Sequence, residues 1–373
     1  MLSAGEASGD LHAAGLIEAI RRRHPDSKFC FLGGDEMARA AGRQPLVHYR
    51  DMAYMGFADV VRHLPQVRRN MELAIKLLRR VRPDALILVD YPSFNLRLGD
   101  AARKLGIPVY YYIAPKVWAW KKFRIRNIRN ICRRVLSILP FEPRFFSENG
   151  YPWCTYVGNP SVEEIDRRLA SAPSHSLFCR LHGLQEMPIL ALVPGSRVSE
   201  IKSNLPVMYE AAQVLESKYQ IVVAAAPGIE RGIYTDLVGS DVPVVENCTT
   251  ELMAVATGAL VTSGTASLEA ALARVPQVVC YRHNASRITY AVMSRVLTIP
   301  YVSLPNLIAN RRVVSELLLH KCTPVEVLRH LVYVLPGHPG YDVQQRGYNR
   351  VRRELGTKPA ADTAAKIILG DLH

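Results

Sequence analysis

The chain has 373 residues, of which 49% are hydrophobic, and its 47 lysines and arginines exceed the 33 aspartates and glutamates to give a formal net charge of +14. Such a chain is long enough for two hydrophobic cores, and its basic balance indicates an anionic partner such as a nucleic acid, a phosphorylated metabolite or a lipid surface. The cysteines are scattered without CxxC spacing, so we expect reduced thiols in a cytosolic protein. The sequence has no apolar run of bilayer length and no signal peptide, so we expect a protein that is neither integral nor exported.

The chain opens on a glycine-bearing turn that carries two carboxylates. Glu6 and Asp10 lie within SAGEASGDLHAAGLIEAI, which begins at residue 3 and continues as a helical pattern. Only Met1 and Leu2 precede this turn, whereas a strand is usually about five residues long. We therefore expect a nearly absent first strand and a natural start that lies several residues upstream.

Short apolar runs then alternate with helical patterns. In the first half the runs are KFCFLGG at 28–34, DALILVD at 84–90, IPVYYYIAP at 107–115 and VLSILP at 135–140. After a polar span the second half continues with ILALVPGS, QIVVAAAPG, VPVVE, ALVTSGT and PQVVCYR, between 189 and 282. This alternation predicts an α/β protein with parallel sheets in two Rossmann-like domains. We place the first domain at 1–160, the second at 161–345, and a helical segment that crosses back to the first domain at 346–373.

Asp90, in LVDYPSFN, follows an apolar run at the position where open α/β sheets bind their ligands. A carboxylate held there on a stiff Tyr-Pro loop could act as a general base towards a substrate hydroxyl. An aspartate that only initiates the turn before proline would give the same pattern. This motif alone does not decide between the two.

The VPGSR motif joins a strand, a tight turn and a helix. Ser196 and Arg197 end the turn, so backbone amides, the positive end of the helix and a guanidinium could meet a diphosphate. An ordinary turn with a surface arginine is the alternative. The motif lacks the GxxxxGK[ST] pattern, which argues against a P-loop NTPase.

The SGTASLEAAL motif repeats that arrangement. Ser263, Gly264 and Thr265 end a strand, and Glu269 lies one turn into the following helix. Its carboxylate could bind a ribose diol or could simply cap the helix. Together with the VPGSR motif, it favours nucleotide binding.

Two basic stretches lie in the first half, at 61–82 and 116–134. Their candidate contact residues are Arg68, Arg69, Arg79 and Arg80 in the first, and Trp118, Trp120, Lys121 and Lys122 in the second. Basic residues interleaved with aromatic or apolar ones suit a nucleic acid, a phosphate-bearing substrate or an anionic membrane. The alternative is a helix face that only contacts solvent. Two such stretches favour a phosphate or membrane surface.

Several enzyme classes lack support. The histidines are dispersed without HExxH or paired His and Cys clusters, so no metal site is expected. No GxSxG elbow supports serine hydrolysis, and no GxGxxG opens either half as a nicotinamide site would require.

Between residue 3 and about residue 310 the chain contains, in this order, the motifs SAGEASGDLHAAGLI, YMGFADV, DYPSFN, APKVWAW, LPFE, YVGNP, VPGSR, SGTASLEAAL and YVSLPNLIA. This ordered set resembles that of the lipid-A-disaccharide synthases. Each is weak by itself, but the ordered set is specific. The resemblance implies a GT-B glycosyltransferase fold, in which two Rossmann-like domains face a central cleft.

The resemblance also implies a reaction without a cofactor or metal. The 2,3-diacylglucosamine of UDP-2,3-diacylglucosamine would pass to the 6-hydroxyl of 2,3-diacylglucosamine 1-phosphate, giving a β-1,6-linked disaccharide 1-phosphate and UDP. By motif, Asp90 would be the base, with Glu6 and Asp10 in the same cleft. The expected UDP-binding residues are Ser196, Arg197, Ser263, Gly264, Thr265, Glu269 and Asn306.

Acylated substrates imply a membrane. We expect a peripheral protein on the cytoplasmic face of the inner membrane, whose basic stretches contact anionic headgroups and the acceptor phosphate rather than a nucleic acid. The resemblance also allows a homodimer. A UDP-sugar epimerase of the same two-domain build is the nearest alternative, and a non-catalytic RNA- or membrane-binding protein is another.

Overall fold

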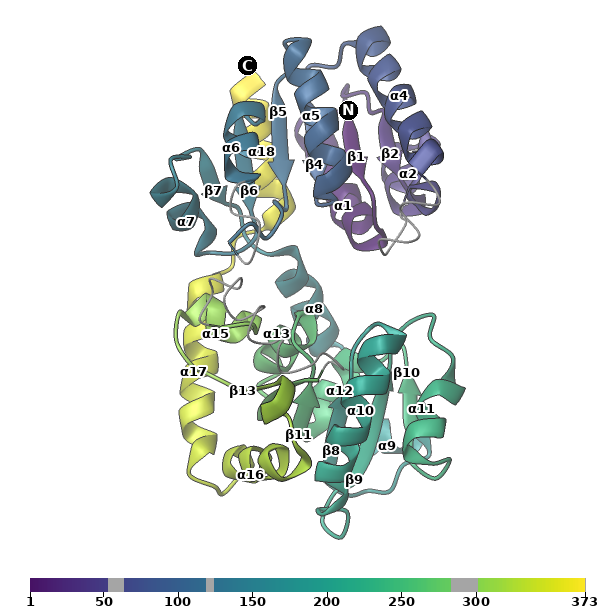
Figure 1. Ribbon diagram of the computed structural model, residues 1–373, viewed down its shortest axis with the longest axis vertical. Helices are drawn as coiled ribbons and strands as arrows, with labels where there is room; N and C mark the ends of the chain where they lie inside the picture. The colour runs from purple at the N-terminus through teal and green to yellow at the C-terminus, as the bar shows by residue number, and fades with distance from the viewer. Residues whose placement is uncertain (53–63, 119–123, 283–300, 373) are drawn as a thin grey trace. The chain divides into compact units, whose positions relative to one another are not determined.

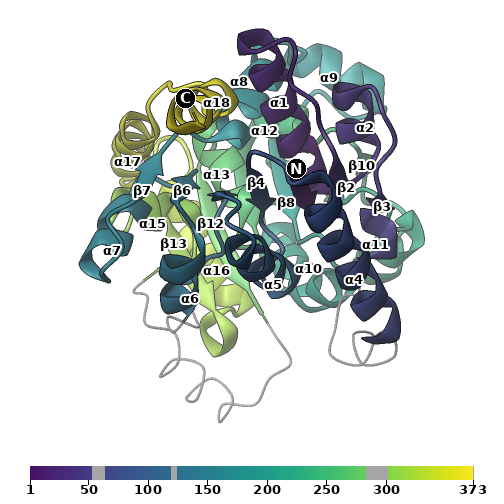
Figure 2. The same cartoon turned by 90° about the horizontal axis from the view of Figure 1, so that it is seen from above.

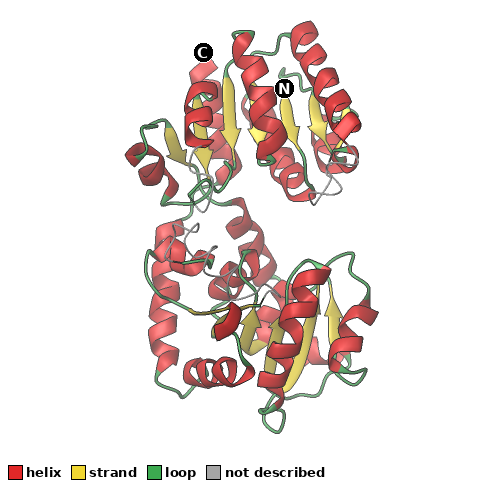
Figure 3. Ribbon diagram, viewed as in Figure 1, coloured by secondary structure: helices red, strands yellow, loops and turns green. Residues whose placement is uncertain are grey.

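The computed structural model describes residues 1–52, 64–118, 124–282 and 301–372. The chain divides into two compact units, one formed by Met1–Pro160 with Thr357–His373 and the other by Ser161–Gly356. Each unit is a parallel sheet covered by helices on both faces (Figure 1; Figure 3). The α/β fold predicted from the alternating runs is confirmed.

The first unit contains a seven-stranded sheet in the order β3-β2-β1-β4-β5-β6-β7. Its strands are β1 (Leu2–Ala4), β2 (Phe31–Gly33), β3 (Val47–His48), β4 (Leu86–Val89), β5 (Val109–Tyr112), β6 (Arg134–Ser137) and β7 (Cys154–Tyr156). Contrary to the expectation of a nearly absent first strand, β1 lies centrally and pairs with both β2 and β4. Ser3 and Ala4 are small enough to be buried completely, which lets the strand continue into the glycine-bearing segment.

Helices cover both faces of this sheet. They are α1 (Ala7–Arg23), α2 (Asp35–Ala41), α4 (Leu64–Val81), α5 (Pro92–Lys104), α6 (Arg124–Ile131), α7 (Glu142–Glu148) and α18 (Ala360–Leu372), with a 3-10 turn at Tyr49–Asp51. One core contains side chains of α4, α5 and α6, and the opposite core contains those of α1, α2 and α18. Figure 2 shows α18 beside α1, where Asp362 pairs with Arg22 at 3.2 Å.

The second unit contains a six-stranded sheet in the order β10-β9-β8-β11-β12-β13. Its strands are β8 (Ile189–Val193), β9 (Gln220–Ala225), β10 (Val244–Glu246), β11 (Ala256–Val261), β12 (Gln277–Tyr281) and β13 (Ser315–Leu318). The helices are α8 (Pro160–Ala170), α9 (His175–His182), α10 (Val198–Gln213), α11 (Arg231–Val238), α12 (Thr249–Val255), α13 (Thr265–Leu272), α15 (Leu304–Ala309), α16 (Pro324–Val334) and α17 (Gly340–Leu355), with a 3-10 turn at Leu319–Lys321. The segment from residue 346 therefore begins inside α17, a helix of the second unit, and only α18 packs in the first.

Each sheet has one point where the strand order reverses. In the first unit the chain passes from β1 to β2, towards one edge of the sheet, whereas from the neighbouring β4 it passes to β5, towards the other edge. In the second unit the same reversal separates β8 from β11. Loops diverge at such points, and open α/β sheets bind ligands in the crevice that results. None of the helices in the described ranges is both long and apolar enough to span a membrane.

Candidate functional site

Asp90 lies at the reversal point of the first sheet, immediately after β4. Its φ is +45° and that of Tyr91 is +46°, so two consecutive residues with side chains adopt the left-handed conformation. Such a conformation costs on the order of 1 to 3 kcal/mol per residue and persists only where the surroundings impose it. The backbone N–H of Asp90 donates to the carbonyl of Ile113, after β5, at 3.2 Å.

Asn95 of α5 holds this strained loop in place. It is completely buried, and its Nδ2 donates to the carbonyl oxygens of Ser3 at 3.2 Å, Val89 at 3.1 Å and Asp90 at 2.7 Å. The Ser3 hydroxyl donates back to Asn95 Oδ1 at 2.7 Å, and the Tyr111 hydroxyl donates to the Asp90 carbonyl at 2.7 Å. Asn95 therefore ties the ends of β1 and β4 together. Sequence reasoning quoted this residue within DYPSFN but gave it no role.

Burial raises the pKa of the Asp90 carboxyl above its ordinary value. The backbone N–H of Tyr91 and the positive charge of Lys116 oppose that shift in the pKa. A carboxylate with a raised pKa is a stronger base, which suits proton abstraction from a hydroxyl.

Glu6 lies beside the Asp90 loop because β1 pairs with β4, with Ala4 opposite Val89. Gly5 packs so closely on the next loop that a Cβ there would lie 2.3 Å from Tyr91 Cγ. Glu6 is half-buried and is the N-cap residue of α1. The opening glycine turn and the Asp90 loop thus meet at one end of the first sheet.

The structure corrects the expected role of Asp10. This residue is 2% exposed, and its carboxylate accepts hydrogen bonds from the backbone amides of Gly34 at 2.6 Å, Glu36 at 3.0 Å and Met37 at 3.3 Å. It therefore caps the start of α2 instead of presenting its oxygens to a sugar hydroxyl.

Trp118 is also corrected, since it is 6% exposed and its side chain lies inside the first unit rather than on its surface. Its Nε1–H donates to Glu142 Oε1 at 2.8 Å, and the Ser137 hydroxyl donates to Glu142 Oε2 at 2.6 Å. Burial raises the pKa of Glu142 to about 7, against the effect of these two hydrogen bonds and of Lys116. Glu142 belongs to the LPFE motif and was missed because nothing in the sequence indicates its burial.

The four arginines named for the first basic stretch lie on α4. Arg68 pairs with Glu72 at 3.2 Å, and Arg69, Arg79 and Arg80 are exposed on the same helix. Its exposed apolar side chains include Leu73 and Val81. The other predicted contacts, Trp120, Lys121 and Lys122, lie outside the described residues, as does the YMGFADV motif.

The VPGSR loop lies at the reversal point of the second sheet, after β8. Gly195 has a φ of +135°, and a Cβ there would lie 2.7 Å from the Glu200 carboxylate. Glu200 accepts a hydrogen bond from the Ser196 amide at 3.2 Å and lies 3.7 Å from the Arg197 guanidinium. Arg197 is exposed and precedes α10, whose N-terminus has no side-chain cap.

Asn204 joins the VPGSR loop to the SGT loop, and sequence reasoning missed it as well. Its Nδ2 donates to the Pro194 carbonyl at 2.9 Å and to Thr262 Oγ1 at 3.3 Å. The next two residues, Ser263 and Gly264, are half-buried. They lead to α13, which begins at the exposed Thr265. The two predicted nucleotide loops therefore lie on adjacent strands and are fixed to each other.

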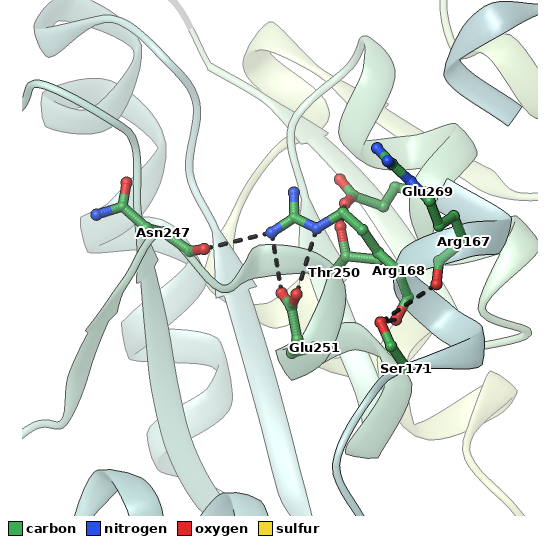
Figure 4. A network of polar contacts seen from close by, with 7 residues as sticks. All are labelled: Arg167, Arg168, Ser171, Asn247, Thr250, Glu251 and Glu269. Carbon is green, nitrogen blue, oxygen red and sulfur yellow. Dashed lines mark hydrogen bonds and ion pairs between the residues drawn. The ribbon is translucent and has the colours of Figure 1, made fainter. Parts of the chain in front are cut away.

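Glu269 of α13 belongs to a polar network with α12 and α8, shown in Figure 4. Its carboxylate accepts a hydrogen bond from the Thr250 hydroxyl. Arg168 pairs with Glu251 at 3.1 Å and donates to the Asn247 carbonyl at 3.3 Å. Burial raises the pKa of Glu269, and Thr250 and Arg168 oppose that shift in the pKa.

Asn306 is not available to UDP, which corrects the prediction. It is 1% exposed, and its Oδ1 accepts hydrogen bonds from the amides of Val313 and Val314 at 2.6 and 2.8 Å. Its Nδ2 donates to the Val314 carbonyl at 3.0 Å and to Glu316 at 2.8 Å. Both donors and both acceptor positions are therefore used inside the protein. Across the described ranges, no cluster of three or more His, Cys, Asp or Glu side chains could hold a metal ion.

Solved structures support the fold at low identity. A UDP-GlcNAc 2-epimerase from Neisseria meningitidis, bound to UDP-GlcNAc, matches with a TM-score of 0.59 at 13% identity, over 100% of this chain and 98% of that one. The calicheamicin glycosyltransferase CalG4 matches with a TM-score of 0.61 at 15% identity, over 100% and 97% of the chains. The epimerase alternative thus has only a distant similarity of fold behind it.

Sequence relatives are much more similar. A lipid-A-disaccharide synthase of Myxococcus xanthus is 41% identical over 377 residues, which cover 99% of this chain and 96% of the relative. One of Neisseria meningitidis is 34% identical over 382 residues, with 99% and 96% covered. Residues 1–368 match the family described as lipid-A-disaccharide synthetase. The chain therefore belongs to the lipid-A-disaccharide synthase family, whose members are glycosyltransferases.

Proposed function

We propose that this chain transfers 2,3-diacylglucosamine from UDP-2,3-diacylglucosamine to the 6-hydroxyl of 2,3-diacylglucosamine 1-phosphate. The products are the β-1,6-linked disaccharide 1-phosphate and UDP. Family membership supports the reaction class, and the observation that carries the chemistry is the strained Asp90 at the reversal point of the first sheet.

Asp90 acts as the general base. Its carboxylate takes the proton of the acceptor 6-hydroxyl while that oxygen bonds to the anomeric carbon of the donor. The bond from this carbon to the diphosphate breaks, and UDP leaves with the electron pair, so the configuration inverts. The raised pKa of Asp90 strengthens the base, and the positive charge of Lys116 favours its ionised form.

The loops of the second unit bind the leaving group. The Arg197 amide and the amides that precede α13, together with the Arg197 guanidinium, supply hydrogen bonds and positive charge to the diphosphate. Ser196, Ser263, Gly264 and Thr265 are the residues of these loops that contact UDP in this proposal. Glu269 binds the ribose hydroxyls with the carboxylate lone pairs that the Thr250 hydroxyl does not occupy.

Glu6 and Asp10 have different roles beside Asp90. Glu6 is half-buried next to the Asp90 loop and contacts acceptor hydroxyls. Asp10 acts indirectly, because its bonds to the start of α2 hold the segment around Gly33 and Gly34 in place. It is therefore a positioning residue.

The exposed cations of α4 contact anionic lipid headgroups and the acceptor phosphate. Arg69, Arg79 and Arg80 supply the charge, and Leu73 and Val81 supply apolar surface next to it. In this proposal the protein acts on the cytoplasmic face of the inner membrane and has no nucleic-acid partner, and the proposal is compatible with a homodimer.

UDP release by the purified chain in detergent, with donor alone and with donor plus acceptor, tests this proposal. We expect acceptor-dependent UDP and a disaccharide, both reduced at least about 100-fold by Asp90→Asn. Asp100→Asn is the matched control, because Asp100 is a surface aspartate of α5 that pairs with Arg103 and Lys104. UDP release that ignores the acceptor would contradict the transferase and favour an epimerase or hydrolase.

A further inference from the structure

A cavity of about 620 Å³ lies in the second unit, away from the VPGSR and SGT loops. It is lined by the segment that starts β13, the second half of α16 and the first turn of α17. Ser315 opens β13 opposite Val278 of β12, whereas the SGT loop follows the other end of β11. Because the strands are parallel, the cavity lies at their amino ends, whereas the proposed nucleotide site lies at their carboxyl ends. Figure 1 shows α16 and the start of α17 meeting there.

The titratable groups that line this cavity are basic or neutral. They include Arg312, Arg329, His330 and His338, and no aspartate or glutamate is among its described lining residues. The nearby carboxylate of Glu326 pairs with Arg329, so it neutralises one of the two arginines. The cavity therefore keeps a net positive charge.

Two of these basic groups converge on one buried hydroxyl. Arg312 Nη2 donates to Ser315 Oγ at 3.1 Å, and His330 Nδ1 lies 3.1 Å from the same oxygen. Ser315 is 9% exposed and comes from the sheet, so its position is fixed. Arg312 has no carboxylate partner in the described part of the chain. A guanidinium and an imidazole thus lie side by side around a neutral group.

The remaining wall adds an apolar surface and the first turn of α17, in which the Tyr341 amide already donates to the His338 carbonyl at 3.1 Å. The helix α17 has 16 residues, and its N-cap residue, Pro339, provides no side-chain hydrogen bond to the first turn. Gly340 lets this turn pack on Tyr333, since a Cβ there would lie 2.5 Å from the ring. Tyr333 and Val343 are 50% and 56% exposed and form the apolar wall.

We propose that this cavity binds a phosphorylated small molecule, with the phosphate against Arg312, His330 and the first turn of α17 and the organic part against Tyr333 and Val343. Its volume lies within the range of about 300 to 1,000 Å³ that small-molecule sites occupy. Guanidinium groups and helix N-termini are the usual protein partners of phosphate. The inference does not depend on the proposed transferase reaction.

Binding should depend on pH through His330. Burial, Arg312 and Arg329 lower the pKa of this histidine, and Glu326 opposes them. A phosphate beside the ring stabilises the imidazolium form, so it raises the pKa of His330. Among the other titratable groups, His338 and Tyr333 line the cavity, whereas Asp342, in the first turn of α17, is not among its lining residues.

The test is a titration of the full chain, labelled in its histidine rings, with phenyl phosphate and with inorganic phosphate, followed by NMR. We expect the His330 ring signals to move, with phenyl phosphate binding more tightly. Arg312→Ala and Val343→Glu should each weaken binding at least about tenfold, because they remove a cation and add a repelling carboxylate. The matched control is Val325→Glu, a 73% exposed valine of α16 outside the cavity.

Equal affinities in all four proteins would overturn the proposal, as would the same ring shifts caused by potassium chloride at equal ionic strength. Loss of binding in Arg197→Ala with retention in Arg312→Ala would place the phosphate at the VPGSR loop instead, and would also overturn it. A failure of transferase activity changes none of these outcomes, so the two proposals are tested separately.

Discussion

Replacement of the buried Glu142 by glutamine should stabilise the first unit at neutral and alkaline pH. Its pKa of about 7, against an ordinary value of 4.5, means that the folded protein disfavours the ionised form. A shift of this size corresponds to about 3 kcal/mol. Glutamine is isosteric and can accept from Trp118 Nε1 while its amide donates to Ser137 Oγ.

The direction of the pH dependence follows from proton binding. Below pH 4.5 the carboxyl is protonated in both the folded and the unfolded state, so it costs nothing. As pH rises, the unfolded chain ionises first, and the folded state loses stability until the pH passes about 7. The gain from Glu142→Gln should therefore be about 3 kcal/mol at pH 8 and under about 1 kcal/mol at pH 4.5.

Urea unfolding followed by tryptophan fluorescence measures this gain. All three tryptophans lie at 118, 120 and 153, inside the first unit, so the signal reports that unit alone. Glu148→Gln is the matched control, because Glu148 is an exposed glutamate of α7 paired with Arg144 at 2.7 Å, and its replacement should change stability by less than about 1 kcal/mol at either pH. A Glu142→Gln protein that is less stable at pH 8, or whose gain is the same at both pH values, would refute the reasoning.

Three further changes probe the Asp90 loop. Asn95→Ala removes a donor from three carbonyl groups, of which that of Asp90 keeps the Tyr111 hydroxyl. We therefore expect a loss of about 1 to 3 kcal/mol in urea unfolding and a fall in kcat larger than the change in KM; an unaltered kcat would contradict a positioning role. Lys116→Met removes the charge that lowers the pKa of Asp90, so the acidic limb of the pH profile of kcat/KM should move to higher pH. Gly5→Ala places a methyl group against the Tyr91 ring, so a lower Tm and a loss of activity are expected, and a wild-type Tm would show that the ring can move aside.

The sequence predicted the sheets because their strands are apolar runs bounded by turns, as in Leu86–Val89 and Val109–Tyr112. The same logic found the ends of these strands, and hence Asp90. It missed β3, β7 and β13, which are edge strands of the two sheets. Their apolar residues are interrupted by the polar His48, Thr155 and Glu316, so they lack the continuous apolar run of the strands that were found.

Sequence patterns could not show which polar side chains make their hydrogen bonds within the protein rather than to a ligand. Asp10 and Asn306 were assigned to ligands because they lie in motif loops, yet backbone amides occupy the oxygens of both. Glu142 and Asn204 received no role, although each holds two neighbouring loops together. These assignments depend on contacts between segments far apart in the chain, which no local pattern contains.

The backbone around Asp90 explains why Asn95 and Tyr111 are needed to hold the loop. Ile113, after the neighbouring strand, also has a positive φ, +59°, which is unusual for a β-branched side chain. Its N–H donates to the Leu136 carbonyl at 3.1 Å, and its own carbonyl accepts from Asp90. The two strained loops therefore support each other across β4 and β5, with Asn95 on one side. If this strain orients the Asp90 carboxylate, relaxing it from either loop should lower kcat, even though Ile113 itself lies outside the proposed chemistry.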